Sequence, residues 1–179
     1  MSRQGRMTIR QATPKDIPFV VEQESRADYR HYIQHWSFEQ HAEALHNPDL
    51  RYHLIVGSDG GRLGYTIHTG LLSPHRSIYL QRLVVVEPGQ GVGRLLLMRL
   101  MEIAFEQWGA HRYWLHVFSE NARARALYRS LEFQEEGQHR DAILLYGVFK
   151  SPISMAVLED EWWANLHAQI DPKTFPSIA

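Results

Sequence analysis

LVVVEPGQGVGRLLL, at residues 83–97, decides the fold of this chain. Its first four residues end a strand pattern that starts at Ser77, and an unbroken apolar run of this kind is expected for a central strand covered on both faces. The glycine-rich turn EPGQGVG leads straight into residues 94–108, which are apolar enough for a buried helix that ends at Gly109. The segment therefore predicts a strand, a glycine turn and a helix in direct succession.

The residues before this segment predict two helices and three strands. Thr13 and Pro14 are the start signal of a helix over residues 17–27. A capping box at SFEQ predicts a second helix that ends near Leu45. The predicted strands cover residues 7–12, 51–57 and 62–70. The last two strands flank the cluster DGG, which is typical of the turn in an antiparallel hairpin.

The residues after Gly109 predict a second strand and helix beside the first pair. The predicted elements are a strand over 111–118, a helix over 120–133, two strands around Gly147 and a terminal helix with Trp162 and Trp163. Because the strands at 77–86 and 111–118 bracket a helix, they are expected to pair in parallel through a right-handed crossover. We therefore predict an α+β domain over residues 7–158, with a mixed, mostly antiparallel sheet flanked by helices. Residues 159–179 are expected to add a helix and a tail.

The composition excludes several classes of function. The 179 residues are 44% hydrophobic and 22% charged, which suits one globular domain. Nineteen basic against twenty acidic side chains leave a net charge of -1, so we expect neither a nucleic-acid partner nor a membrane partner. The absence of cysteine removes disulfides, thiolate metal sites and cysteine nucleophiles. No apolar run approaches the roughly 20 residues that span a bilayer, and the first ten residues lack a signal-peptide core, so we expect a cytoplasmic protein.

The glycine turn has the composition of an anion site. Gly89, Gly91 and Gly93 precede a helix, where backbone N–H groups and the helix dipole favour an anion such as phosphate. A Walker loop needs lysine where Arg94 stands, and a dinucleotide fingerprint needs glycine where Arg94 or Leu96 stands. The alternative is that these glycines serve only the backbone conformation of the turn.

A second pattern lies on the helix that follows. Asn121, Ala124, Arg125 and Tyr128 are spaced to share one helix face. A face made only for packing would more often carry leucine or valine, so this polar face favours ligand contact. The alternative is a solvated Arg125 and an ordinary half-buried Tyr128.

Two segments of the sequence resemble the GNAT superfamily of acyl-CoA-dependent N-acetyltransferases. LVVVEPGQGVGRLLL is similar to the family's QxxGxG phosphate loop, and LHVFSENARARALYRSLEFQEEG at 115–137 is similar to its NxxAxxLYxxxGFxxEG segment. The resemblance covers roughly residues 7–158, and both motifs in this order are more specific than either alone. The later RDAILLYGVFKSPISMAVLEDEW resembles the subgroup that includes ribosomal-protein N-terminal and small-amine acetyltransferases.

The resemblance implies acetyl-CoA as co-substrate and no metal. The residues that would bind it are Val84, Val85, Val86, Gln90, Gly91, Val92, Gly93, Arg94, Asn121, Arg125 and Tyr128. The three valines would pair with the pantetheine arm through their backbone, and the amides of residues 90–94 would hold the pyrophosphate. Arg94 or Arg125 would add positive charge. Asn121 would hydrogen-bond the arm, and Tyr128 would lie beside the sulfur as general acid.

Two residues depart from the family pattern. Pro88 stands where the family usually has Gln or Arg at the head of a longer loop, so one pyrophosphate donor is missing. Glu132 replaces the usual Gly before Phe133. If Glu132 adopts the left-handed conformation that ends a helix, we expect a cost of about 1 kcal/mol.

The expected reaction is direct attack of a neutral amine on the acetyl carbonyl in a ternary complex. The backbone near Val85 would stabilise the oxyanion, and Tyr128 would protonate the departing thiolate. The strand at 77–86 carries no acidic residue, so the base is left open among His116, the weaker candidates Glu22 and Glu24, and water alone. His116 alternates with aromatic residues, so a packed core histidine is the competing interpretation.

The acceptor side is expected in DYRHYIQHWSFEQH, at residues 28–41. Its Tyr29, His31, Tyr32, His35 and Trp36 would line an aromatic pocket or simply pack under the helices. His31 and His35 are four apart, yet no accompanying carboxylate pattern indicates a metal.

Three classes of function stay open at this level. A protein N-terminus is the slightly favoured acceptor of a transferase, and a small amine or an amine-bearing antibiotic is the alternative. A non-catalytic acyl-CoA-binding module and a nucleotide-binding enzyme are the other two classes, and a homodimer is left open.

Overall fold

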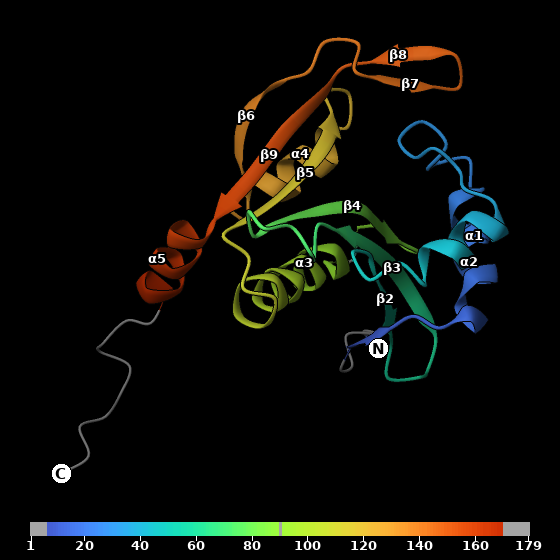
Figure 1. Cartoon of the computed structure of the whole chain (residues 1–179), viewed down its shortest axis with the longest axis horizontal. Helices are drawn as coiled ribbons and strands as arrows, with labels where there is room; N and C mark the ends of the chain where they lie inside the picture. The colour runs from blue at the N-terminus through green and yellow to red at the C-terminus, as the bar shows by residue number, and fades with distance from the viewer. Residues whose placement is uncertain (1–6, 90, 170–179) are drawn as a thin grey trace.

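The computed structural model describes residues 7–89 and 91–169 (Figure 1). A seven-stranded sheet has the strand order β1-β2-β3-β4-β5-β9-β6, and a separate hairpin joins β7 to β8. The strands are β1 (Thr8–Gln11), β2 (Arg51–Val56), β3 (Arg62–Thr69), β4 (Ser77–Val85), β5 (Arg112–Phe118), β6 (Gln134–Gln138), β7 (Ile143–Leu145), β8 (Val148–Lys150) and β9 (Pro152–Leu158). The helices are α1 (Ile17–Glu24), α2 (Phe38–Ala44), α3 (Val92–Glu102), α4 (Ala122–Arg129) and α5 (Glu159–Gln169).

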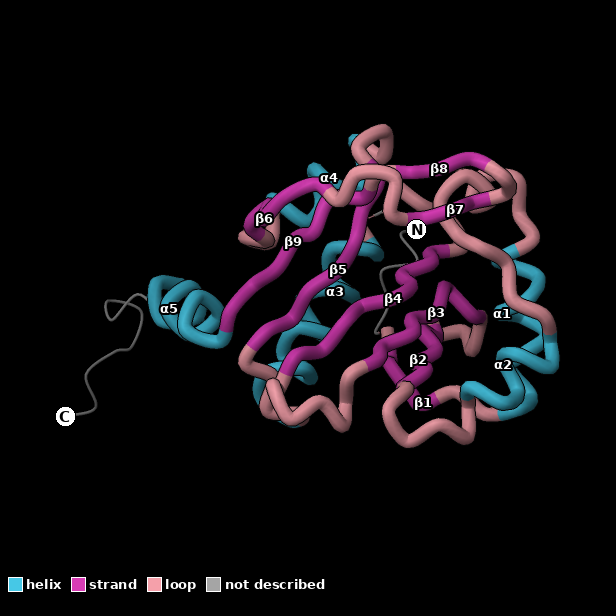
Figure 2. Tube along the Cα trace, turned by 45° about the horizontal axis from the view of Figure 1, so that its top comes forward, coloured by secondary structure: helices cyan, strands magenta, loops and turns pink. Residues whose placement is uncertain are grey.

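The pair β4 and β5 creates the opening that positions the site. It is the parallel pair of the sheet, as the crossover predicts, and every other neighbouring pair is antiparallel. Pairing runs only from Ser77–Arg112 to Leu80–Leu115, although both strands continue further. The register of β4 against β3 also shifts by one residue at Gln81, a bulge that bends the strand. The two strands therefore separate beyond Leu80, and Figure 2 shows the gap between them.

Helices cover both faces of the sheet. One core cluster joins α3 and α4 to β4, β5 and β9, and the other joins α1 to β2 and β3. Neighbouring residues of β2 enter different clusters, with Ile55 in the first and Leu54 in the second. This follows from the alternation of side chains along a strand whose two faces are both covered. Both side chains are fully buried.

The C-terminal quarter corrects the prediction of two strands around Gly147. The structure has four strands there, and Gly147 lies in the turn between β7 and β8. The sequence did not predict β6, because QEEGQ is an exposed edge strand with no apolar alternation. It did not predict the boundary before β9, because Pro152 begins that strand without a preceding glycine turn.

Two predicted helices also end differently. The first ends at Glu24 instead of residue 27, followed by turns. The helix predicted over residues 94–108 widens into a π-helical turn at Ile103–Gln107, after which Gly109 adopts a positive φ of 64°. No helix of the described residues is long and apolar enough to cross a membrane.

Candidate active site

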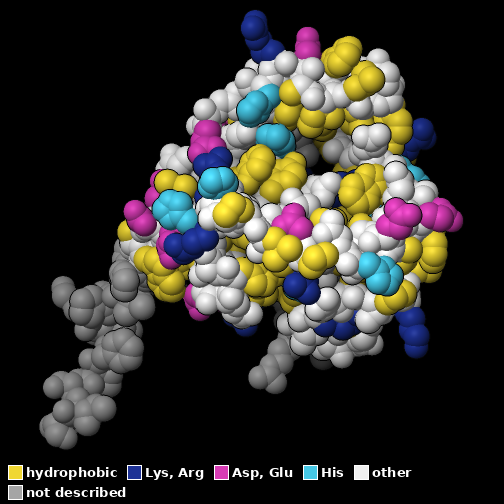
Figure 3. Space-filling view, in the orientation of Figure 1, with side chains coloured by type: hydrophobic (Ala, Val, Ile, Leu, Met, Phe, Trp, Pro, Cys, Tyr) yellow, Lys and Arg dark blue, Asp and Glu magenta, His cyan; other side chains and the backbone are white. Residues whose placement is uncertain are grey.

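The gap between β4 and β5 opens into a cleft of about 600 Å³. Its walls come from the segment between α1 and α2, from β4 and β5, from the turn before α3, from α4 and from the β7–β8 hairpin. Figure 3 shows the hollow beneath this hairpin, rimmed by hydrophobic side chains. A cleft of this volume is within the range of small-molecule binding sites.

The glycine turn forms one end of the cleft. Gly91 precedes α3 with a φ of +76°, and a side chain at this position would point into open space. No side chain caps α3. The amides of Arg94 and Leu95 already donate to the carbonyl of Gly91, at 3.1 and 3.2 Å, so an anion at this helix end would be met by the N–H groups of Val92 and Gly93. Gly91, Gly93 and Arg94 line the cleft, and Val92 begins the helix outside the lining. The predicted contact of Gln90 lies outside the described residues.

The predicted arginines have other partners. Arg94 donates hydrogen bonds of 2.8 and 2.6 Å to the backbone and hydroxyl oxygens of Ser130, although it also borders the cleft. Arg125 pairs with Glu135 at 3.0 Å and does not line the cleft, which corrects the expectation that it faces the ligand. Ala124, Leu127 and Tyr128 form the face of α4 that lines the cleft, and the Arg125 side chain leaves this face to pair with Glu135.

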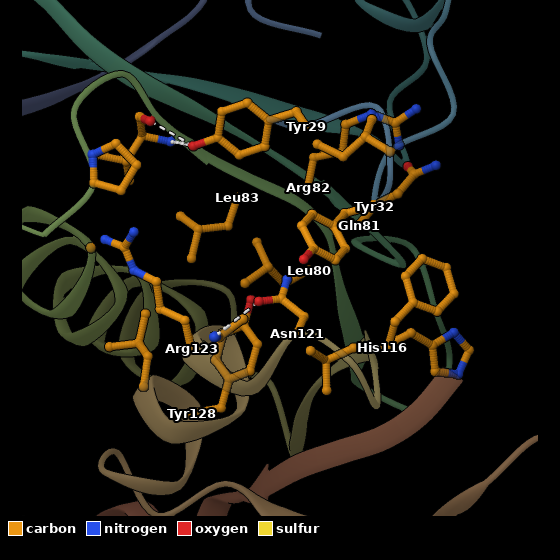
Figure 4. A pocket seen from close by; sticks show the side chains of 18 of the residues that line it. Tyr29, Tyr32, Leu80, Gln81, Arg82, Leu83, His116, Asn121, Arg123 and Tyr128 are labelled. Atoms are coloured by element: carbon orange, nitrogen blue, oxygen red, sulfur yellow. Dashed lines mark hydrogen bonds between the residues drawn. The ribbon is translucent and has the colours of Figure 1, made fainter. Parts of the chain in front are cut away.

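Arg123 is the cation that the sequence argument missed. It lines the cleft, and its guanidinium lies 3.7 Å from where a side chain on Gly89 would begin. Arg123 precedes Leu127 by four residues on the same helix, and Leu127 also lines the cleft. The spacing of four residues between Arg123 and Leu127 is the sequence signal that could have identified Arg123. Figure 4 shows Arg123 beside Tyr128, with Tyr29 on the opposite wall.

The backbone of β4 offers fewer free groups than the resemblance implies. The carbonyl of Val84 faces Gly64 of β3, and the amide of Val86 donates to Leu63 at 2.8 Å. The carbonyl of Val84 and the amide of Val86 are therefore directed to β3, and the carbonyl of Val86 accepts from Arg26 at 2.7 Å. The expected pairing of all three valines with the pantetheine arm stays a prediction. Val85 faces the gap, since alternate residues of a strand direct their backbone groups to opposite edges.

The hydroxyl of Tyr29 occupies both backbone groups of Val85. It donates to the carbonyl at 2.6 Å and accepts from the amide at 3.1 Å (Figure 4). A ligand that pairs with this strand must displace Tyr29 from Val85. Leu83 also lines the cleft and, two residues before Val85, directs its backbone to the same edge.

Tyr128 of α4 and Asn121, which precedes this helix, both line the cleft. Tyr128 lines the middle of the cleft and is only 8% exposed, and this burial raises the pKa of its phenol well above the ordinary value. The phenol is therefore protonated at neutral pH. The side-chain oxygen of Asn121 accepts from the amide of Ala124 at 3.1 Å, which caps α4 (Figure 4). Glu132 follows this helix with a φ of 66°, which is the left-handed conformation considered in the sequence analysis.

Aromatic side chains line the other end of the cleft. Tyr29, Tyr32 and Trp36 belong to the lining, and His31 and His35 do not. The tip of the β7–β8 hairpin packs against the same segment, because the amide of His35 donates to the Tyr146 hydroxyl at 3.2 Å. In the described part of the chain, no group of three His, Cys, Asp or Glu side chains could hold a metal ion.

A buried ion pair supports this aromatic wall. Glu24 accepts from Arg82 at 2.6 Å and from the Tyr65 hydroxyl at 2.9 Å, and its carboxylate is fully buried. The second carboxylate oxygen accepts from the backbone of Trp36 at 3.0 Å, and the Arg82 guanidinium lies over the Trp36 ring. Glu24 is thus a structural anchor of the acceptor segment.

Glu24 is also a poor base. Burial alone would raise the pKa of its carboxyl, but the His41 imidazole, whose Nε2 lies 3.4 Å from the carboxylate, and the charge of Arg82 lower it to about 2. A carboxylate with this pKa holds no useful affinity for a proton at neutral pH. It does not line the cleft, and neither does the exposed Glu22.

His116 has the position of a base. It lies on β5 at the border of the cleft, is half-buried and touches the edge of Tyr79 with ring centroids 5.6 Å apart. Burial and the neighbouring His139 lower its pKa. The imidazole is therefore neutral at pH 7 and has a lone pair to accept a proton.

Comparison with known proteins agrees with this geometry. The model of the GNAT acetyltransferase family matches residues 16–133. The chain belongs to this family. It is an amine N-acetyltransferase with acetyl-CoA as its acetyl donor, as its sequence motifs suggested.

Several similar proteins are named spermidine N-acetyltransferases. A spermidine N(1)-acetyltransferase of Vibrio cholerae is 23% identical over 169 residues, which are 88% of this chain and 96% of that protein. A solved structure of mutant forms of a spermidine/spermine N-acetyltransferase from Vibrio cholerae superposes with a TM-score of 0.79 at 22% identity, covering 89% of this chain and 98% of that one. A dodecameric spermidine N-acetyltransferase from the same organism gives a TM-score of 0.77 at 20% identity, covering 89% and 97%.

Proposed function

We propose that this chain transfers the acetyl group of acetyl-CoA directly to a small primary amine in the cleft between β4 and β5. The observation that carries the proposal is the cleft itself, whose uncapped helix end and aromatic end meet at Tyr128 and His116. The relatives act on a small amine by name, which favours that acceptor over the protein N-terminus that the sequence slightly favoured. The dodecameric relative favours an assembly larger than the homodimer left open by the sequence.

The residues of the chain divide the chemical work between them. Acetyl-CoA supplies an activated acetyl thioester when it is bound. The first turn of α3 and Arg123 hold its phosphates, and Val85 offers its backbone N–H once Tyr29 has moved away. His116 removes one proton from the ammonium form of the amine, and the Tyr128 hydroxyl protonates the departing thiolate. The second proton that the nitrogen loses on becoming an amide returns to the Tyr128 oxygen.

The charge of the cleft restricts the acceptor. Asp28 is the single carboxylate among the described residues of the lining, and it pairs with Arg26 at 2.7 Å. A polyamine carries a positive charge on each nitrogen and needs several carboxylates, whereas the rings of Tyr32, Trp36 and Tyr79 suit an amine with one cation and an apolar body. We therefore expect a monoamine to be a better acceptor than spermidine.

The experiment is thiol release from acetyl-CoA with a panel of acceptors. The panel contains 2-phenylethylamine, spermidine and a short peptide with a free N-terminus. We expect the highest kcat/KM with the monoamine. A higher value with the peptide would contradict the small-amine proposal, a higher value with spermidine would contradict the charge argument, and no release with any amine would contradict the transferase reaction.

A further inference from the structure

Three polar side chains form a hydrogen-bonded chain behind the acceptor end of the cleft. The Nε2 atom of His116 lies 3.0 Å from Oγ of Ser154, and Nε2 of His139 lies 2.7 Å from the same oxygen. His116 and Ser154 are direct partners in the antiparallel pairing of β5 with β9, which fixes their contact. His139 follows β6, and its backbone amide donates to the carbonyl of Pro152 at 2.9 Å. Each member is thus held by the sheet.

These three hydrogen-bonded side chains connect two separate spaces. His116 borders the main cleft, and together with Ser154 and His139 it also lines a second hollow of about 480 Å³. The hollow lies over β5, β9 and β6, on the part of the surface where Figure 3 shows histidine side chains gathered beside the main hollow. His139 is exposed, whereas Ser154 is only 7% exposed. A proton that passes from His116 to His139 therefore leaves the cleft and reaches solvent.

We infer that His116, Ser154 and His139 form the exit path for the proton that the amine loses during acetylation. The inference deepens the proposed function and rests on it. His116 is the catalytic base of this path, and Ser154 and His139 act through it as positioning and relay residues.

The transfer balances atom by atom. The ammonium proton moves to Nδ1 of His116, the proton on its Nε2 moves to Oγ of Ser154, and the Ser154 hydroxyl proton moves to Nε2 of His139. His139 then releases its Nδ1 proton to water, so one proton leaves and the amine is neutral. A hydroxyl group can accept and donate at the same time, which suits Ser154 to the middle position. When the product has left, the reverse shift through Ser154 returns both rings to their starting tautomers, with water supplying and taking one proton.

The reaction needs such a path for a physical reason. An alkyl ammonium has a pKa near ~10, so the acceptor enters almost entirely protonated at neutral pH. Acetyl-CoA and the amine together occupy the main cleft, which separates the reacting nitrogen from the bulk water at its mouth. The second hollow is a separate space, and of the residues that line it only His116 also lines the main cleft.

The surroundings of His116 suit a neutral relay. Tyr79 of β4 and Trp114 of β5 contact its ring, with centroids 5.6 and 5.2 Å away, and neither carries a charge. Arg112 and Glu136, which pair with each other, are the charged residues that line the second hollow. Their charges cancel near the relay.

Two variants interrupt the hydrogen-bonded path at different positions. His139→Ala removes its exposed end and Ser154→Ala removes its middle. His75→Ala is the matched control, because His75 is an exposed histidine in the turn before β4. We expect kcat to fall by about 10- to 100-fold in the two relay variants and to stay unchanged in the control. The affinity for acetyl-CoA, measured by titration calorimetry, is expected to stay unchanged in all three variants.

Chemical rescue separates a relay from a structural role. Added imidazole is expected to restore the kcat of His139→Ala, since it can occupy the second hollow and accept the proton there, and to leave Ser154→Ala unrescued. Ser154→Thr keeps the hydroxyl and is expected to keep more activity than Ser154→Ala. Unchanged kcat in both alanine variants, or a loss in His139→Ala that imidazole does not restore, would overturn the relay while the wild type remains active. If the wild type transfers acetyl to no amine, the proposed function itself has failed.

Discussion

The two ends of the cleft are built in different ways. The cofactor end uses backbone groups of the turn before α3 and side chains of α4, all within one stretch of about fifty residues, 83–133. The acceptor end gathers side chains from the α1–α2 segment, β4, β5, β9 and the β7–β8 hairpin, and a buried ion pair holds it together. The proposed cofactor site is thus one contiguous piece of the sequence, whereas the proposed acceptor site depends on contacts between distant parts of the chain.

Glu24→Gln would break the acceptor end with the largest effect. The substitution leaves the buried Arg82 guanidinium without its counter-charge, and loss of one partner of a buried pair costs about 3–5 kcal/mol. We expect urea unfolding to show a loss of this size. Glu22→Gln, two residues earlier on an exposed position of the same helix, is the control. Equal stability of the two variants would show that the ion pair does not anchor the aromatic wall.

Tyr128→Phe tests the point where the two ends meet. The variant keeps the ring in the core and removes only the hydroxyl that faces the cleft. We expect kcat to fall by about 100-fold, because proton donation in the transition state is worth at least that factor. The acetyl-CoA dissociation constant should change little. If turnover is unchanged, the departing sulfur receives no help from Tyr128.

Arg123→Ala and Arg125→Ala sharpen the description of the cofactor end. Arg123 lines the cleft and Arg125 is paired with Glu135 outside it. A hydrogen bond to a charged group contributes about 1.5–3 kcal/mol, so we expect affinity for CoA to fall by about tenfold or more in the first variant alone. Titration calorimetry at fixed salt would measure this. The reverse order would restore the role that the sequence pattern gave to Arg125.

Glu132→Gly should have the smallest effect. Glu132 has a φ of 66° after α4, and glycine relieves that strain while adding freedom to the unfolded chain. We expect the free energy of unfolding to rise by up to about 1 kcal/mol, measured by thermal denaturation, with kcat unchanged. A loss of stability would mean that the Glu132 side chain makes a stabilising contact.

The contrast between the two ends also explains what the sequence could predict. The strand, glycine turn and helix are one contiguous signal, and the parallel pairing of β4 with β5 follows from the helix between them. Val84 and Arg125 do not line the cleft, because a motif marks the segment whereas the register of pairing and the orientation of α4 decide which side chains and backbone groups face the cleft.

The sequence predicted less of the acceptor end than of the cofactor end, for a physical reason. Tyr32 and Trp36 were named as candidates because they lie in one segment. Ser154 meets His116 through the pairing of β5 with β9, and His139 follows β6, which pairs with the other edge of β9. No apolar pattern marks β6, because it is an exposed edge strand. The buried pair of Glu24 and Arg82 joins residues 58 positions apart, and no spacing rule predicts such a contact.

Initial rates with acetyl-CoA and a monoamine varied together test the central claim most directly. Direct transfer in one cleft requires both substrates to be bound at once, so double-reciprocal plots should intersect. Their slopes should change with the concentration of the second substrate. Parallel lines would indicate an acetylated enzyme intermediate and would contradict direct transfer between the two ends of the cleft.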